Sequence, residues 1–140
     1  MSIGYFEEDV ELPLKESKAL DKVLKSQLRI HKRILGELNF IFCSDDFLLG
    51  MNRQFLNHDY YTDVITFDYC VGRKVSGDVY ISTERVLFNS VIFGQDFQEE
   101  LRRVIFHGFL HLLKYADKDP KDIDEMRRME LVLLKQYDSA

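Results

Sequence analysis

Residues 96–117 read DFQEELRRVIFHGFLHLLKYAD, and this stretch decides the fold. Apolar residues recur every three or four positions between Phe97 and Leu113, which is typical of a helix with one face packed against a core. Asp96 is the expected N-cap, and Glu99 follows it at the spacing of a capping box. The pattern therefore predicts a long core helix around which the rest of the domain is arranged.

Two histidines lie on one face of this predicted helix. Since His107 and His111 are four residues apart, their imidazoles lie only about 40° apart around the helix axis. Asp117 follows where the helix should end. Imidazole suits zinc, iron, nickel and copper, and three protein ligands with an open position are typical of a catalytic metal site. The spacing predicts such a site, the alternative being two unrelated core or rim histidines and a turn aspartate.

Gly108 directly after the first histidine narrows the chemistry. Zinc proteases with two histidines at this spacing carry glutamate in that position as the general base. Peptide hydrolysis is therefore disfavoured. Glycine inside a helix also costs about 1 kcal/mol relative to alanine, a cost that is more readily accepted where another group must approach the helix backbone.

Composition sets wider limits. The 140 residues fit one domain, 1–140, and 46% hydrophobic with 31% charged residues is typical of a globular protein. Cys43 and Cys70 have no metal or redox spacing, which indicates thiols in a reducing compartment. Without a visible leader or membrane-spanning run, we expect a cytoplasmic protein with no membrane partner. The net charge of −5 argues against bulk coating of nucleic acid but allows a local basic cleft.

The remaining segments predict short strands and several helices. Strand composition occurs at 3–6, 38–43, 64–67 and 79–81. Helices are expected at 14–35 with Gly36 as the stop, at 44–56, at 82–93 with Gly94 as the stop, and at 123–134 after a break at Asp119-Pro120. Because strands and helices do not alternate strictly, we expect an α+β fold. It would be a short mixed sheet packed with about five helices, with a metal cleft at the end of the core helix.

Three blocks of the chain, in order, resemble the YbeY family of metal-dependent endoribonucleases of ribosomal RNA maturation. Residues 107–112, HGFLHL, resemble the family signature His-Gly-x-Leu-His-Leu. The other similar segments are 51–55 (MNRQF) with Asp59 and 62–67 (TDVITF), 77–81 (GDVYI), and Met126-Arg127 with Glu130. The resemblance covers nearly the whole chain.

The resemblance implies a small α+β domain that hydrolyses single-stranded RNA. The implied role is maturation of the 3′ end of small-subunit ribosomal RNA, together with ribosome quality control. Ribosomal RNA and the small ribosomal subunit would then be partners, zinc would be the usual metal, and no organic cofactor is expected. Thr62 and Asp63 would line the cleft, although Asp63 also suits a turn into the following strand. Lys114 and Arg53 would contact phosphate.

Two positions depart from the family pattern. The family signature continues Leu-His-Leu-x-Gly-Tyr-Asp-His, and Asp117 stands where it has the last histidine. With a divalent ion, this lowers the net charge of the site from about +2 to about +1, and iron, manganese or nickel then compete better with zinc. Leu56 replaces a family arginine. Arg53, one turn earlier, is the predicted substitute, or else an ordinary exposed helix residue.

These departures leave rival functions open. The first rival is a ribosome-assembly factor in which the metal is structural and nuclease activity is slight or lost. The second is a different hydrolase, such as an amidase, on the same metal centre. No general base can be chosen among His58, Asp59, Asp63 and Asp78.

Overall fold

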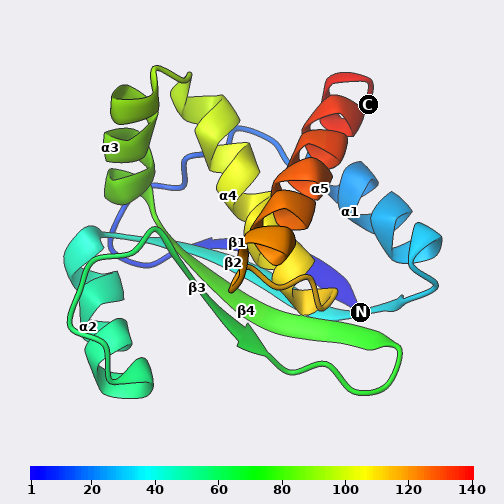
Figure 1. The fold of residues 1–140 in the computed structure, drawn as a ribbon, viewed down its shortest axis with the longest axis horizontal. Helices are drawn as coiled ribbons and strands as arrows, with labels where there is room; N and C mark the ends of the chain where they lie inside the picture. Colours follow the sequence, from blue (N-terminus) through cyan, green and yellow to red (C-terminus); the bar gives the residue numbers. More distant parts are fainter.

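The sheet is mixed and has four strands. A computed structural model describes all 140 residues and places β1 (Ser2–Glu7), β2 (Ile34–Cys43), β3 (Val64–Asp68) and β4 (Lys74–Ser82) in the order β1-β2-β4-β3 (Figure 1). β1, β2 and β4 run parallel, and β3 pairs antiparallel with β4. The predicted α+β class with a short mixed sheet is confirmed.

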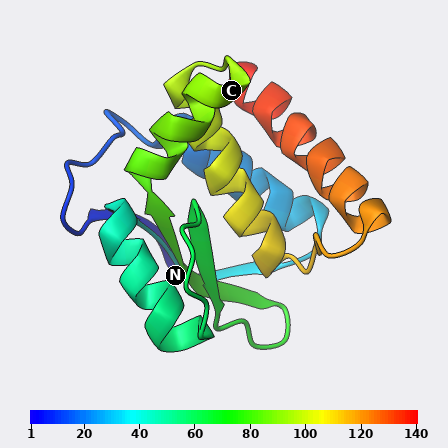
Figure 2. The same ribbon diagram turned by 60° about the vertical axis from the view of Figure 1, so that its left-hand side comes forward.

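Five helices accompany the sheet, as expected: α1 (Lys18–Ile30), α2 (Asp45–Leu56), α3 (Thr83–Phe93), α4 (Phe97–Leu112) and α5 (Pro120–Asp138). α4 crosses β4 and β3, with α5 beside it and α1 beside α5, whereas α2 lies against the opposite face (Figures 1 and 2). Side-chain N-caps begin four of the helices, α2 to α5, and each satisfies a backbone N–H that the helix leaves free. No helix is both long enough and apolar enough to cross a bilayer.

The close approach of α4 to β4 positions the functional residues. A Cβ atom on Gly108 would lie 2.5 Å from Cγ1 of Val79, and one on Gly77 would lie 2.8 Å from Cδ2 of Leu112. Both separations are shorter than a van der Waals contact, so each glycine is required by the other element. The group that approaches the backbone at Gly108 is therefore the sheet.

The first predicted helix was wrong at both ends. α1 begins at Lys18 and ends at Ile30, and Gly36 lies inside β2. The helix ends before Lys32, whose positive φ of 57° reverses the direction of the chain. Gly36 is needed for packing instead, since a Cβ there would lie 2.0 Å from Oγ of Ser76. The last helix also begins earlier than predicted, because Pro120 occupies its first turn, where its missing N–H costs nothing.

Candidate metal centre

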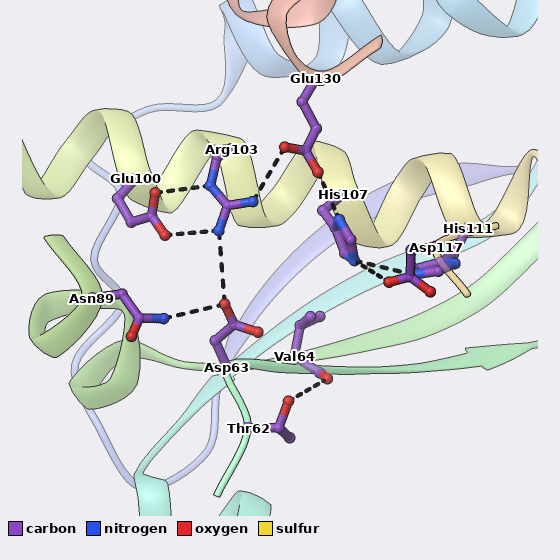
Figure 3. A network of polar contacts seen from close by, with 10 residues as sticks. All are labelled: Thr62, Asp63, Val64, Asn89, Glu100, Arg103, His107, His111, Asp117 and Glu130. Atoms are coloured by element: carbon purple, nitrogen blue, oxygen red, sulfur yellow. Dashed lines mark hydrogen bonds and ion pairs between the residues drawn. The ribbon is translucent and has the colours of Figure 1, made fainter. Parts of the chain in front are cut away.

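Three predicted ligands converge at the C-terminal end of α4 (Figure 3). Nε2 of His107 and Nε2 of His111 are 3.1 Å apart. Oδ2 of Asp117 lies 3.4 Å from the first nitrogen and 3.3 Å from the second. The three ligand atoms thus form a nearly equilateral triangle, and each comes from a different side chain.

The dimensions of this triangle fit one metal ion. Tetrahedral coordination with bonds of about 2.0–2.1 Å requires ligand atoms about 3.3–3.4 Å apart, which is close to the three distances observed. The donor set of two imidazoles and one carboxylate suits zinc and other first-row metals. The group formed by His107, His111 and Asp117 could therefore hold a metal ion with coordination positions left open.

A chain of buried polar contacts fixes the first imidazole. Nδ1 of His107 lies 2.6 Å from Oε2 of Glu130 on α5, so we assign its proton to Nδ1 and the free lone pair to Nε2. Arg103 donates to the other oxygen of Glu130 at 3.2 Å and makes two bonds of 2.8 Å to Glu100. Such a carboxylate behind a histidine orients the ring toward a metal and raises its basicity.

A tight turn after α4 brings the carboxylate ligand back to the helix. Lys114 has a φ of 76°, at the position where the family signature has glycine. The N–H of Tyr115 donates to the carbonyl of Leu110 at 3.0 Å, and its hydroxyl pairs with Nε2 of His31 at 2.8 Å. Tyr115 therefore fixes the turn through both its backbone and its side chain, and the turn brings Asp117 back to the imidazoles of His107 and His111.

Electrostatics favour a cation at this place. Glu100 and Glu130 are almost fully buried, and their neighbours include two further acids, Asp63 and Asp117, with only Arg103 as a counter-charge inside the network. Buried carboxylates are costly unless they are paired or bind a metal. Burial, with a contribution from His107, lowers the pKa of His111 and so favours the neutral imidazole that binds metals.

Asp63 belongs to the same network, as Figure 3 shows. Its carboxylate lies 3.8 Å from the guanidinium of Arg103 and 3.4 Å from the amide nitrogen of Asn89. Burial raises the pKa of Asp63, and Arg103 opposes that shift. Thr62 stands just before it, with its hydroxyl directed to the carbonyl of Val64 at 3.5 Å.

The two predicted phosphate contacts lie apart from the triangle. Arg53, on α2, pairs with Asp59 and is more than half exposed. Lys114 pairs with Asp68 at the end of β3. Neither side chain lines the cavity of about 250 Å³ that contains His107 and Asp117.

The sequence did not identify the buried residues behind His107. The sequence places Glu130 only in a segment similar to the family, and it predicts no role at the site for Arg103 or Glu100. One signal was available: Glu100 precedes Leu101 on the apolar stripe of α4, and Glu130 follows Met129 on that of α5. An acid in a buried stripe requires a partner.

Comparisons with known proteins agree on one family. Residues 4–138 match the family described as Endoribonuclease YbeY. A protein of that name from Parabacteroides distasonis is 45% identical over 130 residues, covering 93% of this chain and 92% of the relative. One from Cytophaga hutchinsonii is 44% identical, covering 92% and 91%. A solution structure of a Thermotoga maritima protein is similar in fold, with a TM-score of 0.62 and 28% identity over 97% of this chain and 89% of that protein.

Proposed function

This chain belongs to the YbeY family of endoribonucleases, and on that basis we propose that it hydrolyses phosphodiester bonds in RNA with a metal ion held by His107, His111 and Asp117. The observation that carries the proposal is the triangle of ligand atoms with sides of 3.1–3.4 Å. Its size fits one ion, and its position beside a cavity leaves room for a phosphate.

We further propose that the ion is zinc, with iron, manganese or nickel able to replace it because one ligand is a carboxylate. A bound ion of this kind polarises a phosphoryl oxygen and lowers the pKa of a coordinated water. Glu130 holds His107 in the tautomer whose Nε2 faces the site. Arg103 donates a hydrogen bond to Glu130 from the opposite side and so holds it in place.

The proposed reaction also involves Asp63, Lys114 and Arg53, whose roles in RNA binding or cleavage stay predictions. Asp63 lies 3.8 Å from Arg103 in the polar network behind His107, and we propose that it acts on a water or a phosphate near the ion. Lys114 and Arg53 carry exposed cations that can meet RNA running beyond the ion. If Arg53→Ala leaves both RNA affinity and cleavage unchanged, Arg53 has no part in the reaction.

The proposed biological substrate is single-stranded RNA at the 3′ end of the small-subunit ribosomal RNA precursor, in the cytoplasm. A role in ribosome quality control would follow from the same activity. We expect cells lacking the protein to accumulate 3′-extended small-subunit RNA. Wild type should restore maturation, and His111→Ala should fail to do so.

The direct test is cleavage of single-stranded RNA by the purified protein during titration with zinc, manganese and nickel. Wild type should cleave and should bind one ion per chain by elemental analysis. His111→Ala should lose both properties, and Asp117→Asn should lose most of its metal affinity. Equal cleavage by wild type and His111→Ala would point to a contaminating nuclease. A bound ion without cleavage would favour the assembly factor instead.

A further inference from the structure

A cleft between α4 and α5 extends away from the ligand triangle. The cavity of about 250 Å³ at the triangle and a second cavity of about 520 Å³ share Arg103, Arg127 and Glu130 as lining residues. The larger cavity extends to Phe93, the last residue of α3. Its volume lies within the range of about 300–1,000 Å³ that is usual for sites that bind small organic groups.

Arg127 is the free cation of this cleft. It lines both cavities and is exposed, yet its guanidinium makes no hydrogen bond or ion pair with the protein. Arg103 differs, because Glu100 and Glu130 engage its guanidinium. In the cavity that Arg127 shares with His107 and Asp117, the other two charged groups, Arg103 and Glu130, pair with each other. The guanidinium of Arg127 is therefore the one left to meet an anion from outside.

The far part of the cleft carries three apolar side chains, from Phe93, Leu131 and Leu134, beside the polar Gln95 and Glu99. Leu131 and Leu134 follow Arg127 on the same face of α5, about 6 and 10.5 Å further along the helix axis. Phe93 faces the same cavity from α3 and is 64% exposed, and Leu131 is 59% exposed. A cation near the ion followed by exposed aromatic and aliphatic side chains matches the alternation of phosphate and base in a single strand.

We propose that the α4–α5 cleft binds the nucleotide next to the scissile phosphate, with Arg127 on its phosphate and with Phe93 and Leu131 against its base. This inference rests on the proposed function, since it places RNA at the ion. It also gives α5 a phosphate contact made by an arginine, in place of the family arginine that Leu56 replaces. Arg127 is a binding residue here, and Arg103 only positions Glu130.

The test measures binding separately from cleavage. The probe is a short fluorescent single-stranded RNA with modified linkages that resist hydrolysis, titrated with zinc-loaded protein. Arg127→Gln should weaken binding about tenfold or more, as expected for a charged hydrogen bond. It should also reduce the slope of log affinity against log salt by about 0.7, the contribution of one phosphate contact in a single strand. Arg128→Gln is the matched control, because Arg128 is the next residue on α5 and its guanidinium already pairs with Glu125.

Phe93→Ala tests the apolar end, with Ile92→Ala as its control because Ile92 is equally exposed on α3 but does not line the cavity. Phe93→Ala should weaken binding at least about fivefold, as for the loss of one stacked base, and should leave the salt slope unchanged. Since Phe93 and Ile92 are both exposed, neither substitution should unfold the protein.

The outcomes separate this inference from the proposed function. If unmodified RNA is cleaved but Arg127→Gln or Phe93→Ala binds the probe as its control does, the cleft assignment is overturned and the nuclease stands. If wild type binds the probe without cleaving RNA, the proposed nuclease activity is overturned. The affinities of the variants then still test whether the cleft binds the nucleotide. If wild type does not bind the probe, the cleft assignment is overturned, and the nuclease is overturned with it only when RNA is not cleaved either.

Discussion

Among single residues outside the ligand triangle, Glu130 should matter most for metal binding. Its carboxylate accepts the Nδ1 proton of His107 at 2.6 Å from a helix that supplies no ligand itself. Glu130→Gln keeps the shape of the side chain but removes the charge behind the ring. We expect metal affinity to fall about 10–100-fold, as for other residues that orient a metal-binding histidine, measured by competition with a chromophoric zinc chelator.

Glu125→Gln is the control for that change. Glu125 lies on the same helix, and its carboxylate pairs with Arg128 at the surface. Its replacement removes the same charge from α5 without touching His107. Equal zinc affinities in the two variants would show that Glu130 has no role in orienting the ring.

Lys114 carries a conformational cost that can be measured. Its φ of 76° lies in the left-handed region, which costs a residue with a Cβ roughly 1–2 kcal/mol and glycine almost nothing. Its ion pair with Asp68 is exposed and contributes at most about 1 kcal/mol. Lys114→Gly should therefore raise the free energy of unfolding by about 0.5–1 kcal/mol in urea titrations. Lys118→Gly, in the same loop without a positive φ, should give no gain, and an equal result for both would refute the argument.

At the level of elements, the close contact between α4 and β4 fixes how near the helix that carries His107 and His111 lies to the sheet. Gly108→Ala improves helix propensity by about 1 kcal/mol but forces a methyl group against Val79, whose Cγ1 would lie at 2.5 Å. Overpacking of this kind costs about 1–3 kcal/mol, so we expect net destabilisation in urea unfolding of the metal-free protein. Gly50→Ala on α2 is the opposite case, because nothing lies within 4 Å of a Cβ there, and it should stabilise. Stabilisation by both substitutions would mean that α4 can move away from the sheet.

The same contrast shows what the sequence could predict and what it could not. The helix starts at Ser44, Ser82 and Asp96 were predicted, because capping depends on neighbouring residues. The convergence of His107 and His111 followed from helix spacing alone. The end of α1 was missed because a lysine takes the left-handed conformation that usually signals glycine.

Contacts between distant elements explain the rest of what was missed. Glu130 reaches His107 only because α5 crosses α4 at that turn (Figure 3). Arg103 joins Asp63, before β3, to Glu130, on α5. No spacing along the chain encodes these pairs. An acidic residue within an apolar stripe indicates that it has a buried polar partner. Which residue is that partner depends on how the helices pack.

For the whole molecule, the ion should act as a cross-link between segments. Two of the proposed ligands come from α4 and one from the loop after it, and Glu130 joins His107 to α5. A ligand that binds only the folded state stabilises it by about 2.7 kcal/mol at a concentration one hundred times its dissociation constant. We therefore expect zinc to raise the melting temperature by roughly 10 °C for a domain of this size.

Thermal unfolding followed by circular dichroism, with zinc and with a chelator, measures this coupling. His111→Ala should melt at the same temperature under both conditions, because two remaining ligands bind zinc too weakly to shift the equilibrium. Lys118→Gly should keep the zinc-dependent rise, since Lys118 is exposed in the loop and is not a ligand. If zinc stabilises His111→Ala as much as wild type, the stabilising ion is bound elsewhere on the protein. The triangle at the end of α4 would then have lost its assignment as the metal centre.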